Sequence, residues 1–315
     1  MATQAAEPQG ADAAGLNPLR RQRSHVGEQI IQAVLVICAA VSVLTTVGIV
    51  FALLEPTVEF FQTVPVTDFL FGTEWSPLFA DPKFGVLPLV NATIVLTAIA
   101  CAVAIPLGLL TAIFLSEYAS PRVRGKIKPA LEILAGVPTV ILGFFALEFF
   151  TQMVLKRFFP DIEVFNALSA GVVMGVMIIP TIASLSEDAM SAVPRALRDG
   201  AYALGSNKRQ VSLRVVVPAA LSGIIAAFVL GISRAVGETM IVTVAAGLQP
   251  NLSWNVFQGM ETMTAFIASA ASGDQPTGSI GYKTIFAVGA LLFVMTLVLN
   301  MISIRLVRKY REVYE

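Results

Sequence analysis

Four long stretches without a single Asp, Glu, Lys or Arg set the strongest limit on how this chain can fold. They are residues 30–54, 84–116, 164–186 and 284–304. Each is long enough to cross a hydrocarbon core, which takes about 20 residues in a helix. Charged residues make up only 13% of the chain. Because a spanning segment must satisfy its own backbone hydrogen bonds, we expect an all-α polytopic membrane protein.

Two further apolar stretches can be assigned as spans only with the help of the distribution of positive charge along the chain. Residues 133–150 are bracketed by Glu132 and Glu148, and a run beginning near Val215 carries Arg234 and Glu238. With six crossings and the N-terminus inside, sixteen of the 21 lysines and arginines fall on the cytoplasmic side and four fall outside. Short cytoplasmic loops retain Lys and Arg in this way. We therefore expect six transmembrane helices with both termini in the cytoplasm, and not seven, which would place the basic C-terminus outside.

This frame divides the chain into regions with different expected structures. Residues 1–24 are rich in Ala, Gln, Pro and Arg and predict a disordered cytoplasmic tail, whereas residues 25–315 form the six-helix domain. The first span lacks a small-residue cleavage site and is expected to remain as an uncleaved anchor. The domain contains an external loop, residues 55–83, and a charged cytoplasmic loop, residues 187–214.

The sequence contains no pattern for a catalytic, metal or nucleotide site. It lacks the glycine-rich loop and lysine that hold nucleotide phosphates, so we expect no ATPase activity in this chain. His25 is the single histidine, and Cys38 and Cys101 lie in apolar runs, where cysteine commonly packs as a small hydrophobic residue. We expect no catalytic residue, cofactor, metal or nucleic-acid partner. An ion-coupled secondary transporter is an alternative, although this function would not explain the charged loop at residues 187–214.

The charged loop predicts a short amphipathic helix on the cytoplasmic face. Pro194 suits the first turn of a helix, and Leu197, Ala201 and Leu204 recur at helical spacing. Gly205 suits the left-handed residue that ends many helices. The alternative is an interfacial helix that rests on membrane lipid headgroups.

The end of this loop resembles the EAA loop of ABC-importer permeases. The residues at the positions of that pattern are Asp199, Gly200, Ala201, Gly205, Val215, Val217 and Pro218. The resemblance implies that the helix docks on an ATP-binding cassette ATPase and transmits its closure to the membrane helices. The residues it implies for this coupling are Pro194, Arg198, Asp199, Ala201, Leu204, Gly205 and Pro218.

A wider resemblance covers nearly the whole membrane region from about Phe69 onward. Residues 82–119, 127–147 and 231–247 resemble the phosphate-specific ABC transporter permease of the PstC type. This implies the type I ABC-importer permease fold and a place in the bacterial inner membrane. It also implies a heterodimer with a PstA-type permease, two ATPase subunits and an external phosphate-binding protein, which the aromatic loop at 55–83 would receive. An aromatic belt at the lipid interface is the other interpretation of that loop, and another oxyanion is the alternative substrate.

Arg234 and Glu238 are the two opposite charges placed deep in a span. An arginine there needs a partner or a water-filled pathway, and its planar donor fork suits phosphate oxygens. At helical i,i+4 spacing the two charges share one face and could also simply neutralise each other. Breaks in the third and fourth spans expose backbone groups that a pathway can satisfy. The pathway candidates are Arg234, Glu238, Thr239, Thr243, Thr139 and Thr181.

Overall fold

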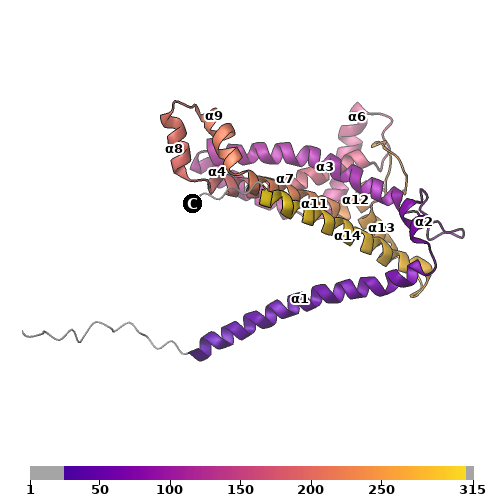
Figure 1. Ribbon diagram of the computed structural model, residues 1–315. Coiled ribbons are helices and arrows are strands. Elements are labelled where there is room, and N and C mark those ends of the chain that lie inside the picture. The colour runs from indigo at the N-terminus through magenta and orange to yellow at the C-terminus, as the bar shows by residue number, and fades with distance from the viewer. Residues whose placement is uncertain (1–24, 310–315) are drawn as a thin grey trace, which may run out of the picture. The chain divides into compact units, whose positions relative to one another are not determined.

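The structure of the chain, a computed structural model, describes residues 25–309, which are mostly helical (Figure 1). The elements are α1 (His25–Phe61), α2 (Val66–Phe71), α3 (Leu87–Ile113), η1 (Phe114–Tyr118), α4 (Pro121–Ala135), α5 (Thr139–Phe144), η2 (Phe145–Leu155), α6 (Lys156–Phe158), α7 (Ala167–Ser191), α8 (Arg195–Ala203), α9 (Lys208–Val211), η3 (Ser212–Val216), α10 (Val217–Ala219), α11 (Leu221–Val236), α12 (Met240–Ala245), α13 (Met263–Ser272) and α14 (Ile280–Lys309), where η marks π-helical segments. Within these residues one isolated bridge, Trp75 to Phe84, is the sole strand-like pairing. The all-α prediction is confirmed.

The described chain forms two parts, which divide within α1 after Ala52. The first part is the apolar N-terminal portion of α1. The second part, residues 53–309, contains the end of α1 and all the other helices. The expected disordered tail, residues 1–24, lies outside the described residues.

The described helices supply five candidate spans, and a sixth if one bent pair of segments is counted as a single span. Five segments are long and apolar enough to cross a membrane, namely Gly27–Phe61, Leu87–Tyr118, Thr139–Phe158, Ala167–Ser191 and Ile280–Arg305. Lys208–Ala219 and Leu221–Val236 give the sixth when this pair, bent by 72°, is taken as one span. All four charge-free runs of the sequence lie mainly in such helices.

The expected boundaries of the third span, residues 133–150, are wrong. Helix α4 ends at Ala135 and α5 begins at Thr139, directly after Pro138. Proline removes a backbone donor and disfavours helical geometry at the residue before it, so the helix breaks here. The apolar residues 133–135 therefore belong to α4, and the crossing runs from Thr139 to Phe158 with Glu148 inside it.

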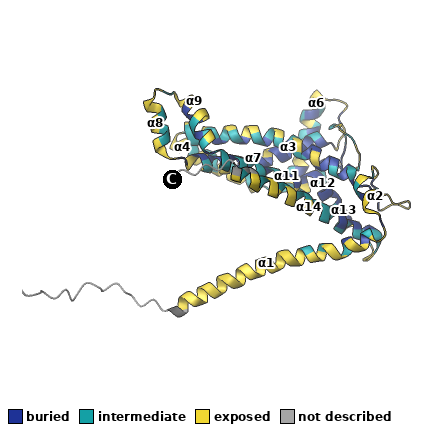
Figure 2. Ribbon diagram, viewed as in Figure 1, coloured by how far each residue is buried: buried dark blue, intermediate teal, exposed yellow. Residues whose placement is uncertain are grey.

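The core of residues 53–309 forms where α3 and α7 pack side by side (Figure 2). Small residues let the two backbones approach closely, as in other membrane helix pairs. A Cβ at Gly171 would lie 2.7 Å from the Ile99 side chain, and one at Gly175 would lie 2.8 Å from the Ala100 carbonyl oxygen. Helix α11 packs on the same α7, where Gly231 faces Ile182. These contacts fix α7 at the centre of the bundle.

The aromatic residues of the 55–83 loop mostly form a second core. Phe60, Phe69 and Trp75 are buried, and the Trp75 ring meets Phe266 of α13 edge to face at 4.8 Å. This corrects both expected roles for these three residues, because a buried ring neither lines a lipid interface nor meets another protein. Edge-to-face pairs of this kind stabilise packing beyond their buried area. Phe79, by contrast, is 75% exposed.

The two ends of residues 53–309 carry different connections. Helices α4, α8 and α9 lie at one end of the bundle, and α2 and α6 lie at the other (Figure 1). The expected cytoplasmic loop, residues 187–214, begins inside α7, which continues to Ser191. The first turn of that loop is therefore part of a membrane helix.

Candidate functional site

Helix α8 is the amphipathic helix that the sequence predicts. Pro194 is its N-terminal flanking residue, and Gly205 follows its C-terminal end with a φ of 81°. The Ser206 amide donates to the Ala201 carbonyl at 3.1 Å, and the Gly205 amide donates to the Tyr202 carbonyl at 2.9 Å. This pair of bonds is the Schellman termination, which needs a residue with positive φ. The left-handed conformation expected for Gly205 is confirmed.

Arg198 anchors α8 to the bundle. Its guanidinium donates to the Val193 carbonyl at 2.6 Å, to the Met190 carbonyl at 2.8 Å and to the Glu117 carboxylate at 3.1 Å. The Arg198 and Glu117 side chains are 17% and 6% exposed. Arg198 therefore turns toward the ends of α7 and η1, and any part it takes in coupling acts through these contacts.

Glu117 is a member of this site that the sequence analysis did not identify. It lies directly after the apolar run 84–116, where an acidic residue has no distinctive spacing. Its carboxylate becomes significant only because the fold brings Arg198, 81 residues later, to it.

The other coupling candidates lie before, on or after α8, and most of them are exposed. Leu204, the residue directly after α8, is 89% exposed. Pro194, Asp199 and Gly205 are also exposed, whereas Ala201 is half-buried. Pro218 lies in α10, just before the bend at Ala220 that separates α10 from α11. The exposed side chain of Leu204 thus offers an apolar contact to a partner.

Arg234 and Thr181 are brought together inside the bundle. The Arg234 guanidinium donates to Thr181 Oγ1 at 3.1 Å and lies 3.3 Å from Met177 Sδ, both on α7. Arg234 is half-buried at the last turn of α11. These contacts hold the guanidinium on one side and leave further N–H donors, since arginine carries five.

Glu238 is not the helical partner of Arg234 that the sequence suggested. Helix α11 ends at Val236, so the i,i+4 face does not form. The Glu238 carboxylate accepts from the amides of Met240 and Ile241 at 3.1 and 3.3 Å and thereby caps α12. Among the described residues no ion pair joins Glu238 to Arg234 within 4.0 Å. Neutralisation by a direct salt bridge is absent from this arrangement.

The remaining pathway candidates make local bonds. The hydroxyls of Thr239 and Thr243 donate to the backbone carbonyls of Gly237 and Thr239, at 3.3 and 2.7 Å. Thr139 begins α5, which packs against α12. In residues 25–309 no side-chain hydrogen bond links Thr139 to Arg234. The structure thus unites Arg234 with Thr181 and places the other threonines on neighbouring short helices.

Two polar residues at or just before the start of α13 were missed by the sequence analysis. Thr264 Oγ1 donates to the Glu238 carbonyl at 2.7 Å and so ties the start of α13 to the break after α11. Glu261 lies in the connection before α13, outside the spanning helices, and burial raises its pKa to about 7. Neither residue lies in a recognisable motif, so only the fold could reveal them.

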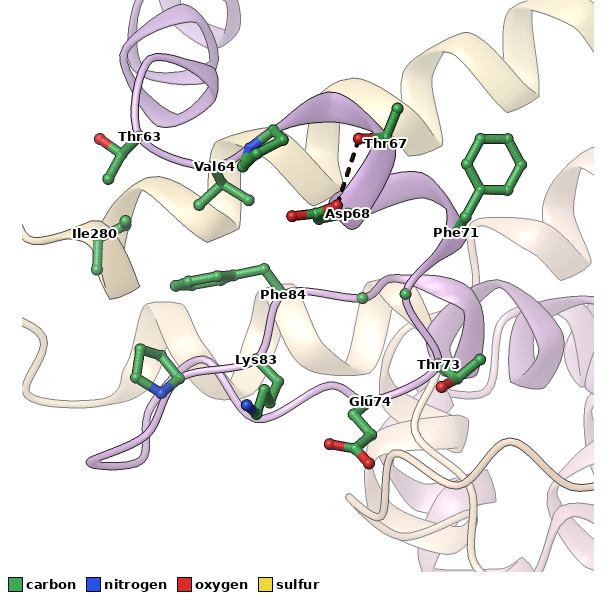
Figure 3. Close-up of a pocket in the computed structure, with 14 residues that line it drawn as sticks. Thr63, Val64, Thr67, Asp68, Phe71, Thr73, Glu74, Lys83, Phe84 and Ile280 are labelled. Carbon is green, nitrogen blue, oxygen red and sulfur yellow. Dashed lines mark hydrogen bonds between the residues drawn. The ribbon is translucent and has the colours of Figure 1, made fainter.

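The end of the bundle opposite α8 carries a hollow of about 830 Å³ (Figure 3). It is lined by α2, by the extended residues around Lys83 and Phe84, and by Ile280. Asp68 and Glu74 supply acidic groups, and Lys83 pairs with Asp81 at 3.1 Å. The walls are fixed by Gly72 and Gly85, because a Cβ at Gly72 would lie 2.5 Å from the Gly85 Cα. A mildly acidic recess therefore lies in the loop at 55–83.

Comparison with known proteins agrees with this architecture. Residues 104–311 match the family described as "Binding-protein-dependent transport system inner membrane component". A probable ABC transporter permease, YqgH of Bacillus subtilis, is 33% identical over 93% of this chain and 94% of its own length. The phosphate transport system permease PstC of Mesorhizobium japonicum is 32% identical over 75% of this chain and 76% of its own length.

Solved structures show the same fold. A chain of a bacterial alginate ABC transporter superposes with a TM-score of 0.65, over 92% of this chain and 98% of that one, at 14% identity. A chain of the MetNI methionine ABC transporter, in an inward-facing conformation, gives a TM-score of 0.54 over 72% and 95%, at 18% identity. The chain therefore belongs to the family of binding-protein-dependent transport system inner membrane components, as a multi-pass permease subunit of an ABC importer.

Proposed function

We propose that this chain is the PstC-type subunit of an importer that moves inorganic phosphate into the cell. The observation that carries the proposal is the relationship to phosphate permeases over three-quarters of the chain, 75% in the case of the Mesorhizobium protein. The half-buried guanidinium of Arg234 adds a chemical reason, because its planar donor fork suits a tetrahedral oxyanion. On this proposal Arg234, Thr181 and the threonines near the α11–α12 break form part of the anion pathway.

The proposed assembly contains four kinds of subunit. A PstA-type permease completes the pathway, two ATP-binding cassette subunits hydrolyse ATP, and an external phosphate-binding protein delivers the anion. Helix α8, with Leu204 exposed, is the proposed contact with one ATPase, and the recess beside Asp68 lies at the end proposed to face outward. The chain itself supplies no ATP hydrolysis in this proposal.

Uptake of radiolabelled phosphate tests this function. The chain and its partner subunits are expressed in bacteria that lack their own ATP-driven phosphate permease, and uptake is measured with and without excess sulfate. We expect saturable phosphate uptake that sulfate does not inhibit and that disappears when the phosphate-holding lysine of the partner ATPase is replaced. Preferential sulfate uptake would assign a different oxyanion. Uptake that persists without ATPase activity would instead indicate secondary transport.

The proposed orientation places α8 in the cytoplasm and α13 near the outer face. In a chain with Cys38→Ala and Cys101→Ala, we expect Ser272→Cys to react with an impermeant thiol reagent added outside intact cells. Ala203→Cys should react only after the membrane is opened, although both positions are exposed on the protein. The reasoning is the excess of Lys and Arg on the α8 side. Labelling of Ala203→Cys from outside would invert the proposed topology.

A further inference from the structure

Helix α4 is attached to the bundle in an unusual way. None of its side chains is buried, and Ile133 is 73% exposed. Its chain enters through extended backbone at Ala119 and Ser120, and it ends at the Gly136–Pro138 break. Helices usually join a bundle through a buried apolar face. Without such a face, α4 needs another means of holding its position against α7.

A buried carboxylate on α7 supplies that attachment. The Glu187 side chain is 0% exposed, and it receives Arg124 and Lys128 from α4, the lysine at 2.9 Å. Ser191 Oγ donates to the same carboxylate at 3.0 Å, and Lys128 also reaches Asp188 at 3.1 Å. Hydrogen bonds to Glu187 and then Asp188 raise the pKa of Lys128 and keep it charged. We call Arg124, Lys128 and Glu187 the α4–α7 clamp.

The clamp is poorly explained by stability alone. Removing charges from water costs about as much as their attraction returns, so apolar residues usually serve a static contact as well or better. Buried charges do select one register between two elements, because any other register leaves a charge unpaired. The clamp therefore holds α4 to α7 in a single arrangement, while the apolar side chains of α4 remain at most half-buried.

The clamp lies between two connections, the one from α7 to α8 and the one from α4 to α5. Helix α7 continues past Glu187 to Met190 and Val193, whose carbonyls hold Arg198 of α8. Helix α4 continues through the Gly136–Pro138 break into α5, which packs against α12. The clamp therefore links α7 and α8 to α4. Through the Gly136–Pro138 break, α4 in turn leads into the third span.

We propose that Glu187 is a positioning residue that makes α4 and the third span follow the movement of α7 during transport. The proposal rests on the proposed function of an ATP-driven importer, and it concerns how hydrolysis is converted into movement. Glu187 contacts no transported anion in this role. It acts through Arg124 and Lys128.

The test uses the complete transporter with its partner subunits, in vesicles loaded with ATP. Phosphate import and ATP hydrolysis are measured together for Glu187→Gln. We expect assembly and ATP hydrolysis to remain, import to fall about tenfold, and the ATP used per phosphate to rise by the same factor, within the range of measured coupling effects. Glu132→Gln, which neutralises an exposed acid on α4 outside the clamp, is the control and should leave the ratio unchanged. An unchanged ratio in Glu187→Gln would overturn the proposal.

A second variant separates coupling from simple charge neutralisation. The triple change Arg124→Met, Lys128→Met and Glu187→Met removes all three charges while keeping long side chains. We expect it to assemble yet import poorly at a raised ATP cost, because flexible apolar contacts do not select the register. Normal import at the normal ratio of ATP used to phosphate imported would overturn the proposal, as would failure of both variants to assemble.

If the wild-type complex imports no phosphate, the proposed function fails instead. The ratio of ATP used to anion imported is then measured with the anion that the complex does import.

Discussion

Arg234→Gln should lower phosphate uptake about 100-fold while the transporter still assembles and hydrolyses ATP. A hydrogen bond to a charged group is worth about 1.5–3 kcal/mol, so loss of the guanidinium removes roughly one to two powers of ten in anion stabilisation. Arg234 is held to Thr181 and Met177 of α7, which orients its remaining donors. The measurements are initial uptake rate, complex assembly and ATPase activity in the same membranes.

The adjacent residue provides a matched control for this change. Ser233 faces α14, where its hydroxyl bonds Asn300 at 3.2 Å, so Ser233→Ala should change uptake little. Arg234→Lys should be impaired as well, because a single ammonium cannot reproduce a planar fork. Normal uptake by Arg234→Gln would remove Arg234 from the pathway.

The double change Arg234→Gln with Glu238→Gln distinguishes the pathway role from charge neutralisation. If the two charges only neutralised each other, removing both would restore uptake, because uptake in the single variants would be lowered by the one buried charge left without a partner. The carboxylate of Glu238 instead accepts from the amides of Met240 and Ile241. We therefore expect no rescue. Uptake near the normal rate in the double variant would contradict the pathway role.

The second large effect is expected for Arg198→Met. Breaking a mostly buried ion pair costs about 3 kcal/mol, and here the two carbonyls of Met190 and Val193 also lose their donors. Helix α8 should then move independently of the membrane helices. Because a loss of about 3 kcal/mol corresponds to more than a factor of ten, we expect phosphate uptake to fall more than tenfold. ATP hydrolysis should continue without coupled import.

Arg195→Met on the same helix tests whether any charge on α8 would have this effect. Arg195 is exposed, and in the described chain no ion pair is formed by it. This control should retain coupled uptake. The role of Arg198 would be contradicted if both variants behaved alike, or if Arg198→Met transported normally.

The sequence predicted the membrane architecture because that depends on local properties. A run of about 20 or more residues without a charge is long and apolar enough to cross a bilayer as a helix, so residues 30–54, 84–116, 164–186 and 284–304 could be assigned from the sequence. The Schellman end of α8 was equally local, because Gly205 needs only its own turn to adopt positive φ. Where two local signals competed, as at Ile133 beside Pro138, the boundary was misplaced.

Interactions between side chains could not be predicted in this way, because they depend on which helices meet. Glu117 and Glu187 acquire partners on other elements, at separations of 81, 63 and 59 residues. Aromatic residues of the 55–83 loop became a core because α13 and α14 cover them, and Glu238 lost its expected partner because α11 stops at Val236. The sequence alone determined which segments are helices and which cross the membrane, because backbone satisfaction in lipid is a property of each segment. Only the tertiary structure decided which charges pair, because pairing requires two distant segments to be held a few ångströms apart by the packing of α3, α7 and α11.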